Sequence, residues 1–255
     1  MNRTANILWL VTIYLFFYIP IGILIVYSFN DSKYSLVWQG FTLDWYRALL
    51  ADTDIQLVAL NSIVIGVLSA TGATLIGTLA ANSLYRYQFH GKKFLHAFVF
   101  VLIVSPDIVM GISLLILFST LKMSLGFWTL LLSHITFCIP FVIVTVYSRL
   151  TSIDKNIFEA AKDLGAPEGM IFRKILIPLI WPAILAGWLL SFTLSLDDVM
   201  ISFFVTGPEF EILPLKIFSM VRLGVKPEVN ALCTVMFVIT LLLVLIAQFA
   251  LRKKR

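Results

Sequence analysis

Long apolar stretches alternate with short charged segments along this chain of 255 residues. The six apolar stretches are about 4–30, 55–85, 94–121, 123–148, 175–208 and 229–251. Within them the charged side chains are three aspartates, Asp107, Asp197 and Asp198. A helix needs about 20 apolar residues to cross a hydrocarbon core about 30 Å thick. Each stretch therefore predicts a membrane-spanning helix.

The pattern indicates an all-α integral membrane protein, which we take as one transmembrane domain over residues 1–255. We place its six spans at about 6–28, 57–83, 94–118, 126–148, 179–205 and 230–251. The first apolar stretch is too long for a signal-peptide core, and no A-x-A-like cleavage site follows it, so we interpret it as a retained span.

Composition and charge placement agree with a membrane protein. Hydrophobic residues make up 60% of the chain and charged residues 13%, against about 25% charged in soluble domains. The net charge of +5 does not indicate nucleic-acid binding, because most Lys and Arg lie in short segments between spans or in the C-terminal cluster 252–255, which we interpret as an anchor. The side richer in Lys and Arg carries both termini, so the positive-inside rule places both termini in the cytoplasm.

Two features bear on how the spans pack. Small residues recur at three- and four-residue intervals in the second span, and such stripes allow close helix approach in membranes. The stripe is Gly66, Ala70, Ala73, Gly77 and Ala81. Prolines inside spans each remove a backbone donor and bend the helix. They are Pro20, Pro106 and Pro140.

The sequence contains no motif for catalysis or for ATP binding. G-x-x-x-x-G-K-[ST], H-E-x-x-H and G-x-S-x-G are all absent. The spacing of His90, His96 and His134 does not make a metal site, so we expect them to be packed or interfacial. Cys138 and Cys233 fall inside predicted spans and are expected to be reduced. We therefore expect no catalytic residue, metal or cofactor on this chain.

The segment 149–178, between the fourth and fifth spans, predicts two short helices joined by a tight turn. Asp154 suits an N-cap, and Ile157, Ala161 and Leu164 recur on one helical face. Gly165 suits a left-handed helix end, and Pro167 suits the first turn of the next helix.

This segment resembles the EAA signature of binding-protein-dependent ABC importer permeases. The matching residues are Glu159, Ala160, Ala161, Gly165, Ile175 and Pro178, with Ile177 where the family usually has Leu. The resemblance implies a coupling helix that docks in a groove of an ATPase subunit, with Glu159 pairing with basic groups, the alanines allowing close approach and Gly165 making the turn. The alternative is an amphipathic hairpin lying on the membrane.

The resemblance extends over nearly the whole chain and is strongest to the permeases of polyamine (spermidine/putrescine) importers, particularly their second permease subunit. Residues 105–111 and 195–208 are similar to that group. The family implies a type I (MetI-like) permease fold in the bacterial inner membrane. It also implies a homologous second permease, an ATPase dimer that holds ATP and Mg, and a periplasmic or extracellular solute-binding protein. A permease for another small organic solute, or an ion-coupled secondary transporter, remains an alternative.

Acidic residues inside spans are costly and usually functional. Ser191, Ser195, Asp198 and Ser202 follow helical spacing on one face of the fifth span, with Asp197 about 100° away. We therefore expect Asp198, more than Asp197, to line a solute pathway together with Asp107, Ser195 and Ser202. Trp188 would add a cation–π contact. The alternative is that these acids hydrogen-bond between subunits or lie at wet loop ends.

Overall fold

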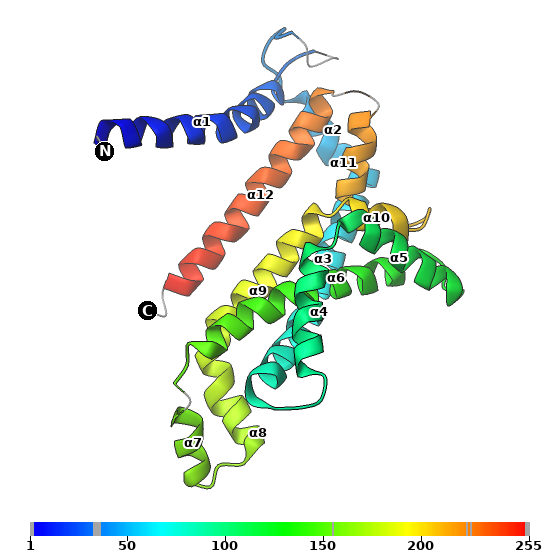
Figure 1. Cartoon of the computed structure of the whole chain (residues 1–255). Helices are drawn as coiled ribbons and strands as arrows, with labels where there is room; N and C mark the ends of the chain where they lie inside the picture. The colour runs from blue at the N-terminus through cyan, green and yellow to red at the C-terminus, as the bar shows by residue number, and fades with distance from the viewer. Residues whose placement is uncertain (1–2, 33–36, 155, 223, 225, 253–255) are drawn as a thin grey trace. The chain divides into compact units, whose positions relative to one another are not determined.

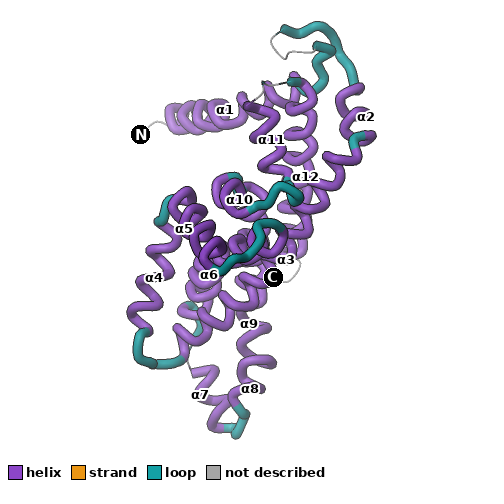
Figure 2. Tube along the Cα trace, turned by 90° about the vertical axis from the view of Figure 1, so that its right-hand side faces the viewer, coloured by secondary structure: helices purple, strands orange, loops and turns teal. Residues whose placement is uncertain are grey.

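The computed structural model describes residues 3–32, 37–154, 156–222, 224 and 226–252, and these residues form helices joined by short turns (Figure 1). The helices in chain order are α1 (Arg3–Tyr27), α2 (Asp44–Ala51), α3 (Thr53–Arg86), α4 (Lys92–Val104), α5 (Asp107–Thr120), α6 (Phe127–Thr151), α7 (Asn156–Asp163), α8 (Glu168–Met170), a π-helical turn η1 (Ile171–Leu176), α9 (Ile177–Asp197), α10 (Met200–Val205), α11 (Leu213–Arg222) and α12 (Pro227–Arg252). Figure 2 shows the same helices as tubes in a second view. The all-α prediction is confirmed for this part of the chain.

The chain forms two compact units, residues 59–215 and residues 1–58 with 216–255. The predicted single transmembrane domain over residues 1–255 stays a prediction. In the larger unit, α6 lies along α9, and α5 packs against α10. Its core consists mainly of aliphatic side chains with Phe118, Phe137 and Phe158.

The small-residue stripe of α3 packs as its spacing predicts. Ala70, Ala73 and Ala81 are fully buried. A Cβ added at Gly77 would lie 2.7 Å from Val142 Cβ and 3.3 Å from the Ile139 carbonyl oxygen, both on α6. Because Gly77 has no side chain, the backbones of α3 and α6 come close together at this position.

Two of the six predicted spans are interrupted. The predicted span 94–118 is two helices, α4 and α5, bent by 111°. The break falls at Ser105 and Pro106, because a residue before proline is disfavoured in the α conformation and proline donates no backbone hydrogen bond. The predicted span 179–205 is also wrong as one helix, because α9 ends at Asp197 and α10 begins at Met200. Pro20 and Pro140, by contrast, lie inside the continuous helices α1 and α6.

In the smaller unit, α12 packs against α1 and α2. The loop before α2 is held by polar contacts, since Trp45 Nε1 donates to the Asn30 carbonyl at 2.9 Å and Tyr46 bonds Ser28 at 2.6 Å. Asp54 forms an ion pair with Lys216. The basic cluster at 252–255 lies outside the residues whose side chains the structure describes.

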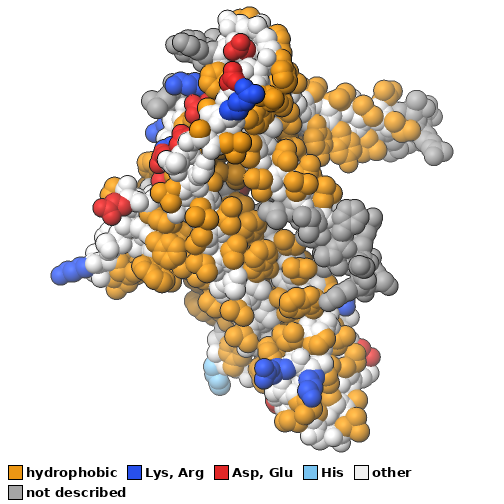
Figure 3. Space-filling model, turned by 180° about the vertical axis from the view of Figure 1, so that it is seen from behind, with side chains coloured by type: hydrophobic (Ala, Val, Ile, Leu, Met, Phe, Trp, Pro, Cys, Tyr) orange, Lys and Arg blue, Asp and Glu red, His pale blue; other side chains and the backbone are white. Residues whose placement is uncertain are grey.

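Four helices in the described part of the chain are long and apolar enough to cross a membrane, and the bent pair α4–α5 makes a fifth if it counts as one span. The four are Ile7–Tyr27, Thr53–Arg86, Phe127–Thr151 and Glu168–Asp197. Their outer surfaces are largely apolar, as hydrophobic side chains cover much of the face drawn in Figure 3. Such surfaces suit lipid as the solvent.

Candidate functional site

The segment between α6 and α9 forms a helical hairpin, in which α7 turns back onto the helix that begins with α8. Asp154 Oδ1 accepts a hydrogen bond from the Asn156 backbone N–H at 3.0 Å, which caps the start of α7. Gly165 follows α7 with a φ of +78°, and the next amide, that of Ala166, donates to the Ala161 carbonyl at 3.0 Å. Pro167 precedes the first residue of α8. The predicted first short helix and the tight turn are confirmed. The second short helix is wrong as a separate element, because α8 continues through η1 into α9 as one helix, Glu168–Asp197.

The buried side chains of α7 are only partly those that recur on one helical face. Phe158 and Ala161 are buried, whereas Ile157 is exposed and Leu164 is 88% exposed. The aromatic ring decides the face, because Phe158 lies under the Arg86 guanidinium at 5.5 Å and packs into the core of the larger unit. Of the three apolar residues that share one helical face, only Ala161 is therefore buried, whereas Ile157 and Leu164 project from the hairpin.

The residues of the EAA signature fall into two groups. Glu159 and Ala160 are exposed on α7, and Pro178 is exposed near the start of α9. Ala161 is buried and Ile175 is half-buried. The hairpin thus presents an outer surface containing Glu159, Ala160 and Leu164, while Ala161 packs inward.

An ion cluster fixes the hairpin to the end of α3. Glu168, the first residue of α8, pairs with Arg86 Nη2 at 2.6 Å and with Lys162 Nζ at 2.9 Å. The Lys162 hydrogen bond and the positive charges of Arg86 and Lys162 hold the pKa of the Glu168 carboxyl below its ordinary value of 4.5. Glu168 and Arg86 were missed by sequence reasoning because they are 82 residues apart and belong to no motif.

The Glu168 pairs predict a pH-dependent hairpin. A carboxyl whose pKa is lowered by folding stabilises the fold above its unfolded pKa, and this contribution is lost as the pH falls through the folded value. We expect hydrogen exchange of the α7 amides to be slower in the wild type than in Glu168→Gln at neutral pH. The difference should disappear on acidification below 4.5, the ordinary glutamate value.

Asp163→Asn is the matched control, since Asp163 is an exposed carboxylate at the end of α7, the helix whose amides are measured. It should leave the exchange of α7 nearly unchanged at every pH. A wild-type exchange pattern in Glu168→Gln at neutral pH would contradict a stabilising role for the cluster.

The acids of the broken helices are placed differently from expectation. Asp198 is 8% exposed and lies in the gap between α9 and α10, where its carboxylate accepts bonds from the Ile201 and Ser202 amides and from the Ser202 hydroxyl. Asp197 is exposed, and so is Asp107 at the start of α5. The helical spacing was extrapolated across a break between α9 and α10. The preference for Asp198 over Asp197 as a pathway residue stays a prediction.

Ser195 and Ser202 lie on the same buried side as Asp198, where both contact His134 of α6. Ser195 Oγ is 2.7 Å from His134 Nδ1, and Ser202 Oγ is 2.9 Å from His134 Nε2. Trp188 is half-buried, stacks on Phe192 and donates to Thr71 Oγ1 at 3.1 Å. The polar stripe of the predicted fifth span therefore faces the interior of the larger unit. The role of these residues in a solute pathway stays a prediction.

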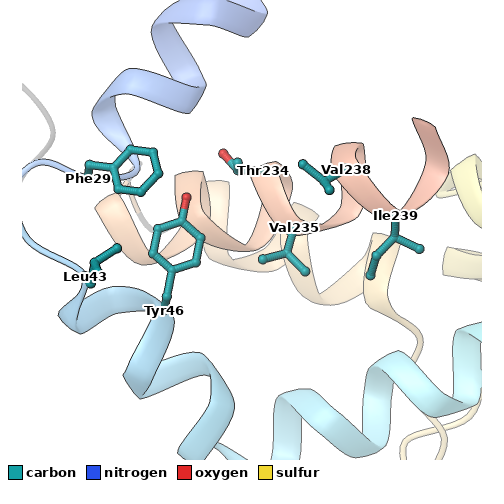
Figure 4. Close-up of a pocket in the computed structure, with 7 residues that line it drawn as sticks. All are labelled: Phe29, Leu43, Tyr46, Thr234, Val235, Val238 and Ile239. Atoms are coloured by element: carbon teal, nitrogen blue, oxygen red, sulfur yellow. The ribbon is translucent and has the colours of Figure 1, made fainter. Parts of the chain in front are cut away.

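The smaller unit contains an apolar pocket (Figure 4). Tyr46 of α2 projects from below toward α12. The lining is Phe29, Leu43, Tyr46, Thr234, Val235, Val238 and Ile239. Because this lining carries no charged side chain, the pocket does not suit a charged solute. Among the described residues, no group of three or more His, Cys, Asp or Glu is arranged to hold a metal ion.

Comparison with known proteins decides the family. Residues 73–254 match the family described as the binding-protein-dependent transport system inner membrane component. This chain belongs to that family. It is thus a multi-pass membrane permease and a transport subunit rather than an enzyme. The EAA resemblance and the apolar helices agree with this assignment.

Two named relatives of this permease are polyamine transport proteins. It is 57% identical to the spermidine/putrescine transport system permease protein PotC of Escherichia coli K12 over 246 residues, which cover 96% of this chain and 93% of that protein. It is 44% identical to the putrescine transport system permease protein PotI of the same organism over 227 residues, covering 86% and 80%.

Solved structures confirm the fold of the permease. A bacterial ABC transporter involved in the import of the acidic polysaccharide alginate matches with a TM-score of 0.75 at 18% identity, covering 99% of this chain and 98% of that one. The MetNI methionine ABC transporter in an inward-facing conformation matches with a TM-score of 0.67 at 16% identity, covering 79% and 98%. At these identities the likeness concerns fold and not solute.

Proposed function

We propose that this chain is one permease subunit of an ATP-driven importer of polyamines such as spermidine and putrescine. The observation that carries the proposal is the 57% identity, over 96% of the chain, to a permease named for that activity. The family assignment and the solved ABC importers of the same fold support the transporter class.

The proposed topology has six spans with both termini in the cytoplasm. The sixth span is α12, which extends over Pro227–Arg252, and the third is the bent pair α4–α5. The excess of Lys and Arg near the chain ends and in the segments 86–93 and 149–174 supports this orientation. The α7–α8 hairpin then lies in the cytoplasm, where a nucleotide-hydrolysing partner would reach it.

The partners follow from the exposed face of the hairpin and from the family. We assign ATP and Mg²⁺ to a separate ATPase dimer, because this sequence lacks a phosphate-binding loop. Glu159, Ala160 and Leu164 would contact that dimer, and Gly165 shapes the turn that presents them. A homologous second permease would complete the pathway, and a periplasmic or extracellular solute-binding protein would deliver the polyamine. ATP binding and hydrolysis would then drive alternating access through the hairpin.

Exposed carboxylates are the groups of this chain best suited to meet a polycation. Asp107 and Asp197 are both exposed and lie at the two helix breaks. An unpaired acid in the membrane attracts a cation strongly because little water screens its charge. We therefore propose these two acids as solute contacts, whereas Asp198, Ser195 and Ser202 would act from behind the pathway surface. Trp188 remains a candidate for a cation–π contact.

Reconstitution of the purified subunits tests the proposed function. In proteoliposomes that contain the chain, its second permease and the ATPase dimer, labelled spermidine should accumulate only when ATP and the loaded binding protein are both present. Omission of the ATPase, or a non-hydrolysable ATP analogue, should reduce accumulation to the level of empty liposomes.

The alternatives give different results in the same assay. Accumulation by the chain alone under a proton or sodium gradient would contradict the proposal and favour a secondary transporter. ATP-dependent uptake of another organic solute, with no competition by excess spermidine, would keep the ABC class and overturn the polyamine assignment.

A further inference from the structure

A buried imidazole bridges the break between α9 and α10. His134 of α6 is fully buried, as are Ser69 and Ser202, and Ser195 and Asp198 are nearly so. Its ring touches the last turn of α9 through Ser195 and the first turn of α10 through Ser202. Asp198 Oδ2, in the gap between the two helices, is 3.4 Å from Nε2.

For a neutral imidazole, the hydrogen bonds around the ring fit one assignment of protons. The Ser202 hydroxyl donates to Asp198 Oδ2 at 2.7 Å, so its oxygen accepts from His134. His134 therefore carries a proton on Nε2, and in the neutral ring Nδ1 accepts the Ser195 proton. Ser195 Oγ in turn accepts from Ser69 of α3 at 3.1 Å, a proton that Ser69 shares with the Gly66 carbonyl.

These bonds form a one-way chain that links four helices. It begins at Ser69 on α3, passes through Ser195 on α9 and His134 on α6, and ends through Ser202 of α10 on the Asp198 carboxylate. In this hydrogen-bond chain, the hydroxyls of Ser195 and Ser202 each donate once and accept once, whereas the Ser69 hydroxyl only donates. Buried polar networks that are fully satisfied favour one arrangement over others, because breaking any link leaves an unpaired polar group.

The position of α10 matters beyond its own six residues. Its other end is fixed to α6, where Thr129 Oγ1 donates to the Val205 carbonyl at 2.8 Å. Its backbone also lies against α5, since a Cβ added at Gly111 would be 3.3 Å from Ile201 Cα. Displacing the first turn of α10 therefore displaces α5, which carries the exposed Asp107 at its start.

We propose that His134 is a positioning residue for transport, which holds the first turn of α10 and the Asp198 carboxylate in place across the break. It does not contact the solute, since its side chain is inaccessible in this arrangement. Its action is through Ser202 and Asp198. The inference rests on the proposed transport function for its uptake assay, but its spectroscopic test does not depend on which solute is carried.

Three substitutions of His134 distinguish its hydrogen bond to Ser195 from its hydrogen bond to Ser202. In His134→Gln, the longer amide side chain places its N–H donor near the position of Nε2, so it can still donate to Ser202. In His134→Asn, the shorter amide places an acceptor only near the position of Nδ1, toward Ser195. His134→Leu removes both. We expect His134→Leu and His134→Asn to lower the uptake rate about tenfold or more, the loss expected when a buried hydrogen bond next to a charge is broken. His134→Gln should retain most of the wild-type rate.

Cys138→Ala is the matched control. Cys138 is fully buried one turn after His134 on α6, and it is not part of the hydrogen-bond chain. Its uptake rate should stay close to that of the wild type. Assembly of each variant complex is measured by size-exclusion chromatography, and rates are compared per assembled complex. If His134→Leu does not assemble, the contrast between His134→Gln and His134→Asn decides.

A double-mutant cycle distinguishes positioning from general packing. If His134 acts through Ser202, then His134→Leu combined with Ser202→Ala should be no slower than the slower single variant. Spin labels at the exposed positions Leu132 of α6 and Phe203 of α10 report the helix position directly. Their distance distribution should broaden or shift in His134→Leu and stay narrow in Cys138→Ala.

Three outcomes would overturn the proposal. They are additive effects in the double-mutant cycle, an unchanged distance distribution in His134→Leu, and equal uptake by His134→Asn and His134→Gln. If the wild-type complex did not take up spermidine, that result would contradict the proposed function instead. It would leave the spin-label test of His134 intact.

Discussion

Replacing Gly207 with alanine is expected to prevent normal folding of the permease. Gly207 follows α10, and a Cβ at this position would overlap the backbone carbonyl oxygen of Leu125 before α6. A clash with a flexible side chain can be relieved by rotation, but a clash with backbone requires the two segments to separate. Overpacking costs about 1–3 kcal/mol, and more where the backbone must move. The yield of folded protein and its melting temperature in detergent should both fall sharply.

Gly22→Ala provides the control for this prediction. Gly22 lies in α1, and a Cβ there would have no neighbour within 4 Å. Alanine also favours a helix more than glycine does by about 1 kcal/mol. This variant should therefore be as stable as the wild type or slightly more stable. A wild-type melting temperature in Gly207→Ala would show that the two segments are farther apart than described.

The second large effect is expected at the tip of the hairpin. Leu164→Asp should strongly weaken association with the ATPase dimer while leaving the permease folded, because the leucine is 88% exposed. A side chain that acts as a hot spot of an interface contributes about 2 kcal/mol or more, and its loss then lowers the affinity at least about thirtyfold. Co-purification of the ATPase and binding by microscale thermophoresis measure the loss.

Phe89→Asp controls for the introduced charge. Phe89 is an exposed apolar residue in the turn between α3 and α4, which the proposed topology places on the same side of the membrane. This variant should retain the ATPase. Equal affinity of the Leu164→Asp and wild-type permeases for the ATPase would refute docking through the hairpin tip.

Local sequence rules were sufficient for the start of α7 and for the turn that follows it. The left-handed turn at Gly165, the cap at Asp154 and Pro167 before α8 each depend on a few neighbouring residues. Periodicity alone does not show which side of α7 is buried, because it treats Ile157, Phe158 and Leu164 as equivalent. The larger aromatic ring took the interior, where the Arg86 side chain lies over it.

The interruptions of the spans were predicted less well. Counting apolar residues gives the length of a span but does not show where a helix turns, so 94–118 and 179–205 were read as continuous. The predicted bend at Pro106 is confirmed, and it is a complete break between α4 and α5, because the residue before a proline disfavours the α conformation. The second break has no proline. Asp198 caps the start of α10 there, and this role is apparent only from the backbone amides that donate hydrogen bonds to its carboxylate.

The polar contacts that tie distant segments together were beyond the reach of sequence patterns. His134 and Asp198 lie in different predicted spans, and Arg86 pairs with Glu168 across 82 positions. One chain offers no rule for pairing such residues, since several acids and bases have equal claims. Each pair was found only when the fold brought the helices together.

The sharp bend at Ser105 and Pro106 has a consequence for hydration. Where a helix stops inside a bilayer, the last carbonyl oxygens and the first amides lose their partners, and hydrocarbon cannot replace them. The bend is therefore stable only where water, a ligand or another protein reaches it. We expect an aqueous vestibule at this elbow, and it should shield these groups from acyl chains throughout the transport cycle.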